Sequence, residues 1–67
     1  MISAQSVIDV LTITAKNHGM AVEKIEFENR DVHGIRAGNE VISFQSWQIP
    51  STNDDLIDFV RKKLNIA

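Results

Sequence analysis

The dipeptide Gly38-Asn39 constrains the fold of this chain more than any other feature of its sequence. It separates two segments rich in β-branched and aromatic residues, 31–37 (DVHGIRA) and 40–47 (EVISFQSW). Glycine and asparagine both adopt positive φ at low cost, which a two-residue hairpin turn requires. The dipeptide therefore predicts an antiparallel hairpin in which Ala37 lies opposite Glu40.

This register divides the hairpin into two faces, because side chains alternate along a strand. It pairs Ile35 with Ile42 and His33 with Phe44. The face with these four residues is the more apolar, and we expect it to line the core. The opposite face carries a mixed set: Val32, Gly34, Arg36, Val41, Ser43, Gln45 and Trp47.

Residues 3–17 are predicted to form a helix, with Ser3 as its N-cap and Gly19 just past its end. The apolar residues on one side of this helix have the spacing i, i+3, i+4, i+7: Ala4, Val7, Ile8, Leu11 and Ala15. The segment is also rich in β-branched residues, which suits a strand. The caps at both ends favour the helix.

Two further elements complete the expected fold. Residues 20–28 alternate as a strand does, with Ile25 and Phe27 on one side. After Pro50, a last helix opens at Ser51 or Thr52. Its expected buried stripe is Leu56, Ile57, Val60 and Leu64, with Phe59 on the flank.

The order helix, three strands, helix with short connections predicts one α+β domain over residues 1–67. Its architecture would be a two-layer α-β-β-β-α fold, in which a three-stranded antiparallel meander has both helices packed on one face. The second face of such a sheet is uncovered, so Trp47 would lie opposite the core.

Composition narrows the class of protein. The chain of 67 residues contains no cysteine, and its nine acidic and seven basic side chains give a formal net charge of −2. No stretch resembles a signal peptide, and no apolar run approaches the ~20 residues that cross a bilayer. We expect a cytoplasmic protein without a membrane partner.

Catalysis, metal binding and cofactor binding have no visible basis in the sequence. His18 and His33 are the only histidines, and no third ligand stands at a useful spacing from either. The acidic side chains are scattered over predicted strands and turns, and no hydroxyl stands beside a convincing base. We therefore expect no enzyme activity, no metal, no cofactor and no small-molecule substrate.

Trp47 is the main candidate for a partner-binding residue, and two interpretations are open. On the uncovered sheet face it would form a patch with Val32, Arg36, Val41 and Gln45, with Val22 as a further candidate neighbour. Exposed tryptophan and arginine are typical of interaction hot spots. Alternatively, the chain bends after the strand and places Trp47 under the last helix as core filler.

A second candidate surface lies on the first helix. Val10 and Ile13 project away from its main apolar stripe. They indicate either self-association or a helix buried over more than half its circumference.

Nucleic-acid binding is the alternative function. It would use Lys24, Arg30, Arg36 and the basic run 61–63, although the overall charge is acidic. The order of elements resembles that of double-stranded-RNA-binding domains, whose last helix presents basic side chains to phosphates. Here that helix starts with Asn53-Asp54-Asp55, so the chain is not assigned to that family.

The sequence thus predicts a small protein-protein interaction module, acting alone or as a homodimer. The predicted partner is another protein or a second copy of the chain. Chains of this size and composition are common among accessory and inhibitor-type proteins of bacteria and phages.

Overall fold

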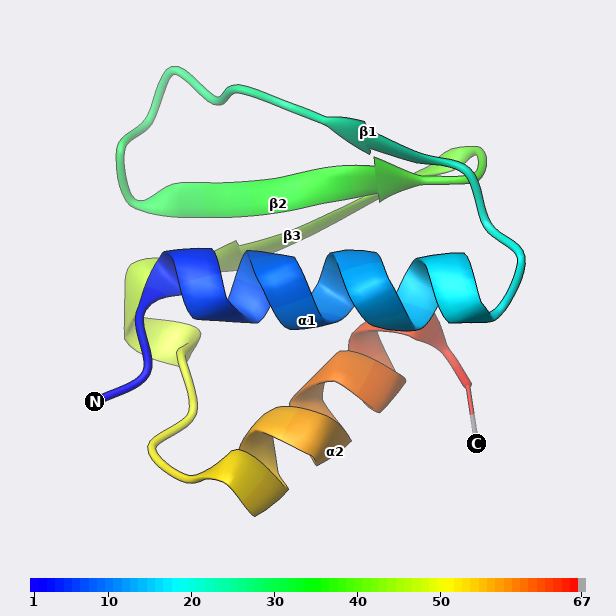
Figure 1. The fold of residues 1–67 in the computed structure, drawn as a ribbon. Coiled ribbons are helices and arrows are strands. Elements are labelled where there is room, and N and C mark those ends of the chain that lie inside the picture. The colour runs from blue at the N-terminus through cyan, green and yellow to red at the C-terminus, as the bar shows by residue number, and fades with distance from the viewer. Residues whose placement is uncertain (67) are drawn as a thin grey trace.

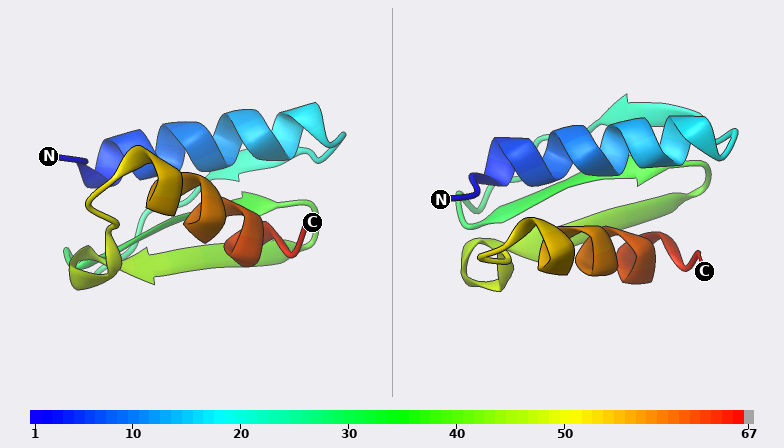
Figure 2. Two further views of the ribbon diagram at one scale, coloured as in Figure 1. Left: turned by 90° about the horizontal axis from the view of Figure 1, so that it is seen from below. Right: turned by 60° about the horizontal axis from the view of Figure 1, so that its bottom comes forward.

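A computed structural model describes residues 1–66 and shows two layers (Figure 1). The elements in chain order are α1 (Ala4–Asn17), β1 (Val22–Lys24), β2 (Val32–Ala37), β3 (Glu40–Gln45), the 3-10 turn η1 (Ser46–Gln48) and α2 (Asn53–Leu64). The strands form one antiparallel sheet in the order β1-β2-β3. Both helices pack on the same side of this sheet (Figure 2). The predicted α-β-β-β-α architecture is confirmed.

The predicted hairpin register is also confirmed, from Val32 opposite Gln45 to Ala37 opposite Glu40. The turn differs from the expectation in one respect. Only Gly38 has a positive φ, of 63°, while Asn39 does not. A positive φ at the first turn position alone is the mark of a type II′ turn, which matches the twist of the strands equally well.

The core lies between the inner face of the hairpin and the two helices. Its buried members are Val7, Leu11, Ala15, Ile35, Ala37, Ile42, Phe44, Leu56, Val60 and Leu64. The predicted helix stripes are confirmed except at one place on α2. Ile57 is 48% exposed, whereas Phe59 packs edge-on against the Phe44 ring with 5.9 Å between centroids. The helix is rotated toward the larger side chain because the aromatic contact buries more apolar surface.

Strand β1 is much shorter than the predicted strand 20–28. In the observed register Lys24 lies opposite Ile35, on the helix-covered face. A longer strand would place Glu26 on that face next, opposite the half-buried His33, where its carboxylate would lose part of its hydration. The chain leaves the sheet after Lys24, and Phe27 is half-buried outside it. Val22 also lies on the covered face and packs against the core, so its predicted place beside Trp47 is wrong.

Both predicted helix starts are confirmed, and the structure selects one cap for α2. Ser3 Oγ accepts from the N–H of Ser6 at 3.1 Å, and Thr52 Oγ1 accepts from the N–H of Asp55 at 3.1 Å. Thr52, and not Ser51, is therefore the N-cap of α2.

Replacing Thr52 with alanine should lower the free energy of unfolding by about 1 kcal/mol, because the Asp55 N–H loses its acceptor. Ser51→Ala is the matched control and should leave stability within about 0.5 kcal/mol of the wild type. Urea unfolding followed by circular dichroism measures both. Equal losses in the two variants would contradict this assignment of the cap.

Candidate interaction surface

Trp47 is exposed, with 70% of its surface accessible. The regular strand ends at Gln45, and the 3-10 turn Ser46–Gln48 carries the tryptophan away from the core. The interpretation of Trp47 as core filler under α2 is therefore wrong. The other interpretation, with Trp47 on the uncovered sheet face, is correct in that Trp47 is exposed. Trp47 nevertheless belongs to a turn at the end of the sheet and not to a strand.

Hydrogen bonds hold this turn in place. The Ser46 N–H donates to the carbonyl of Asp31 at 2.8 Å, and the Ser46 hydroxyl also donates to that carbonyl at 3.3 Å. His33 Nε2 lies 2.9 Å from the same hydroxyl, so this ring nitrogen has a hydrogen-bond partner. At the start of the turn, the Gln45 N–H donates to Gln48 Oε1 at 2.8 Å. The tryptophan is thus displayed from a preorganised base, which lowers the entropy lost on binding.

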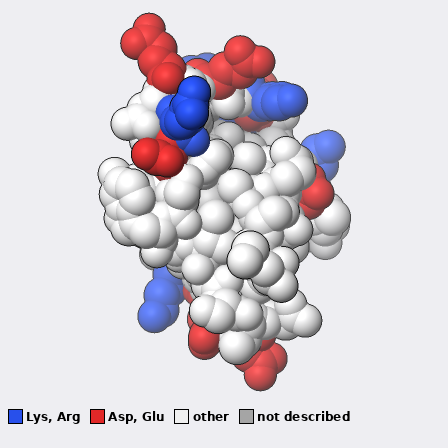
Figure 3. Space-filling view, turned by 90° about the vertical axis from the view of Figure 1, so that its left-hand side faces the viewer, with Lys and Arg blue, Asp and Glu red and all other residues white. Residues whose placement is uncertain are grey.

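The turn lies next to a part of the surface that has no acidic or basic side chains. Residues 1–8 and 41–53 contain no Asp, Glu, Lys or Arg, and both segments reach this end, where the N-terminus lies beside η1 (Figure 1). Figure 3 views the molecule from this side and shows charged side chains around its margin with an uncharged area between them. We call this area the uncharged end; it comprises Met1, Ile2, Ser46, Trp47, Ile49, Pro50 and Ser51.

The uncharged end is hollowed, and both apolar and polar side chains line the hollow. A depression of about 460 Å³ is lined by Met1, Ile2, Ser46, Ile49, Pro50 and Ser51. Trp47 follows Ser46 in the same turn and is, with Met1, one of the two most exposed large apolar side chains among the described residues. A shallow depression next to an exposed tryptophan is an arrangement that a protein partner can fill.

The other predicted members of the Trp47 patch are distributed along the outer sheet face. Val32 and Gln45 lie opposite each other at the end of the hairpin nearest η1. Arg36 and Val41 form a pair nearer the Gly38 turn, about 13 Å away along the strand at ~3.3 Å per residue. Arg36 Nη1 lies 3.9 Å from a carboxylate oxygen of Glu23.

The predicted second stripe on α1 is not a continuous patch. Ile13 is 60% exposed, but Val10 is half-buried and packs against the core. Val10 faces a hollow between the helices, where Ile57 of α2 also lies. Val10 is apolar because α1 is buried over more than half of its circumference, and Ile13 is an isolated exposed apolar residue.

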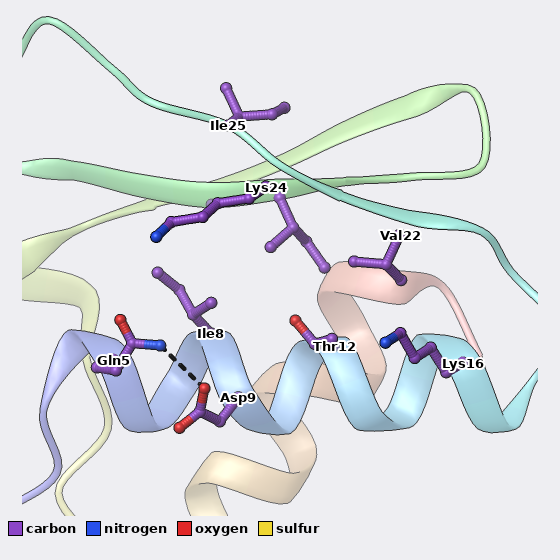
Figure 4. A pocket seen from close by; sticks show the side chains of 10 residues that line it. Gln5, Ile8, Asp9, Thr12, Lys16, Val22, Lys24 and Ile25 are labelled. Atoms are coloured by element: carbon purple, nitrogen blue, oxygen red, sulfur yellow. Dashed lines mark hydrogen bonds between the residues drawn. The ribbon is translucent and has the colours of Figure 1, made fainter.

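The basic residues of the nucleic-acid alternative lie on different surfaces. Lys24 faces a groove of about 280 Å³ between the sheet and α1, where Figure 4 shows it above Ile8. Arg36 is on the opposite face of the sheet, beside Glu23. The run 61–63 ends α2, in the other layer. Lys24, Arg36 and the run 61–63 therefore do not form one continuous positive surface for a phosphate backbone.

Within residues 1–66, no group of three His, Cys, Asp or Glu side chains is placed to hold a metal ion. None of the helices there has the length and apolar character needed to span a membrane. Comparisons with protein-family models, curated proteins and solved structures found no match.

Sequence reasoning identified Trp47 but missed the residues that surround it. Met1 and Ile2 reach the uncharged end from the other terminus of the chain, and no local pattern links them to Ile49 and Pro50. The sequence does contain one signal. The two longest segments without charged side chains, 1–8 and 41–53, are the ones that meet there.

Proposed function

We propose that this chain is a small protein-interaction module that binds another protein through the uncharged end, with Trp47 as the central anchor. The observation that supports the proposal is a 70% exposed tryptophan on a hydrogen-bonded turn, next to Ser46, which lines a depression with apolar and polar walls. Tryptophan is among the residues that contribute most to protein interfaces, especially where the surrounding surface excludes water.

The composition of this surface indicates the kind of partner. A partner with an apolar surface would bury the tryptophan, which offers roughly 150–250 Å² of contact area. Because the uncharged end carries no acidic or basic side chains and its one charged group is the α-amino group of Met1, the affinity should depend less on salt than nucleic-acid binding does. An accessory or inhibitor-type role in the cytoplasm of a bacterium, or of a cell infected by a phage, is consistent with a chain of this size.

Trp47→Ala should weaken binding to the partner at least about tenfold while changing stability by no more than about 0.5 kcal/mol. The experiment uses the immobilised full chain to capture proteins from a cell extract. A captured protein is then purified and titrated against the wild type and the variant. Ile13→Ala is the matched control, since Ile13 is also exposed but lies on α1, away from the uncharged end.

Equal affinity of the Trp47→Ala variant and the wild type would contradict the proposal. A second outcome would favour the nucleic-acid alternative. In that case, nucleic acid binds the chain and the affinity falls steeply with salt, as counterion release requires.

A further inference from the structure

We infer that a second copy of this chain pairs with the free edge of β3, so that two three-stranded sheets join in one continuous sheet about a twofold axis at Ser43. This inference deepens the proposed function by naming a partner for the surface next to Trp47. It rests on the proposed function only in treating the region around η1 as a binding surface.

Within residues 1–66, the edge of β3 that faces away from β2 has no partner strand. Strand β3 pairs with β2 alone, and Figure 2 (left) shows it at the margin of the sheet. The direction of its backbone groups follows from the ladder. The Ser46 N–H donates to the carbonyl of Asp31, just before β2, at 2.8 Å. Backbone groups alternate in direction along a strand, so the N–H and C=O groups of the even-numbered residues of β3 point toward β2. The N–H and C=O groups of Val41 and Ser43 therefore point outward.

This edge also lacks the features that normally prevent strand pairing. Natural edge strands are kept short or carry charges, prolines or bulges. The other edge of the sheet follows that rule, because β1 spans only Val22–Lys24 and carries Glu23 and Lys24. Strand β3 spans Glu40–Gln45 and has neither charge nor proline after its first residue. Because the β1 edge is protected and the β3 edge is not, β3 is the edge at which we expect another strand to pair.

The occupant that fits best is β3 itself in antiparallel orientation. With the axis at Ser43, the two Ser43 residues exchange both backbone hydrogen bonds. The Val41 N–H then donates to the carbonyl of the partner's Gln45. Small serines meet at the centre and valine meets glutamine on either side, so no like charges oppose each other.

Gln48 and Trp47 define where this pairing ends. The Gln45 N–H is already bonded to Gln48 Oε1 at 2.8 Å, which stops the ladder at that residue. Beyond it, the register brings the turn with Trp47 beside the partner's Val41. Trp47 and Val41 are 70% and 53% exposed in the single chain. Because the dimer is symmetric, this contact would occur two times and bury both side chains in each copy. A domain this small gains stability from such burial.

Sedimentation equilibrium over a wide concentration range tests the inference on the full chain. The wild type should show a concentration-dependent mass that rises from 7.5 kDa toward twice that value. Ser43→Pro should raise the dimer dissociation constant about tenfold or more, because proline has no N–H to donate at the axis. That N–H points away from β2, so the ladder within the chain is retained.

Two variants at the same position complete the design. Ser43→Ala keeps the backbone donor and should dimerise like the wild type. Ser43→Lys also keeps it, but sets two like charges opposite each other, and should weaken the dimer as Ser43→Pro does. Ser43→Lys therefore decides the result if circular dichroism shows that the proline variant does not fold.

A wild type that stays monomeric throughout the range would overturn the inference, as would a dimer that Ser43→Pro and Ser43→Lys leave unchanged. The proposed function is judged separately. A monomeric wild type that binds a captured protein through Trp47 overturns only the dimer. A dimer sensitive to Ser43 substitutions, with heterologous binding insensitive to Trp47→Ala, overturns only the proposed function.

Discussion

Phe44→Ala is expected to lower the free energy of unfolding by about 3–5 kcal/mol. Phe44 is 2% exposed and joins both layers. Its ring centroid lies 5.5 Å from that of His33 and 5.9 Å from that of Phe59 on α2. Alanine would leave a cavity where the hairpin and α2 meet. Folded domains are stabilised by roughly 0.05–0.15 kcal/mol per residue, or about 3–10 kcal/mol for this chain. The substitution thus removes a large part of the total.

Equilibrium unfolding in urea, followed by circular dichroism, measures this loss. The matched control is Val41→Ala on the outer face of the same strand, where the side chain is 53% exposed in the single chain; both variants are unfolded at a chain concentration below the dissociation constant of the inferred dimer. It should change the free energy of unfolding by about 0.5 kcal/mol or less. A loss for Phe44→Ala no larger than that of the control would show that the junction between hairpin and α2 is not a main source of stability.

The elements predicted correctly from the sequence are those specified by local chemistry. The turn at Gly38, the N-cap Ser3 and the apolar stripe of α1 each depend on residues within a few positions of one another. The period of side chains along a strand then assigns the faces of the hairpin without further information. Fold class followed because short connections leave few topologies.

The errors occur where contacts distant in sequence decide the outcome. Strand periodicity continues through residue 47, but the turn at Ser46 is fixed by Asp31 and His33, far earlier in the chain. The rotation of α2 that buries Phe59 depends on Phe44 across the core. No period within a single segment contains this information.

In the candidate site, too, the features set by local sequence were predictable and those set by contacts distant in sequence were not. Trp47 was identifiable as a candidate because a lone tryptophan in a small chain is either core or contact, and its exposure in the structure excludes the core. The shape of the uncharged end was not predictable, because the residues around its depression come from both ends of the chain. The roles of Arg36, Val41, Val32, Gln45 and Ile13 as partner contacts stay predictions.

Gly34→Ala is expected to destabilise the chain by about 3 kcal/mol or to prevent folding, the upper end of the range for overpacking. Gly34 is buried in the middle of β2, opposite Ser43 of β3. A Cβ at this position would overlap the carbonyl oxygen of Ile42 and lie 2.8 Å from the Cα of Ser43. Both are backbone atoms of the paired strand, so no side chain can rotate to make room. The two strands would have to separate, which weakens the ladder.

Gly38→Ala separates this steric effect from the conformational cost of losing a glycine. Gly38 has a φ of +63°, and a Cβ there would meet no atom within 4 Å. Its replacement should therefore cost about 1–2 kcal/mol through backbone strain alone. In thermal and urea unfolding, the free energy of unfolding of Gly34→Ala should be well below that of Gly38→Ala. If Gly34→Ala is the more stable of the two, β2 and β3 tolerate a wider separation than the structure shows. That result would mean that the β3 backbone at Ser43 can move away from Gly34. The predicted destabilisation depends on this backbone keeping its position next to Gly34.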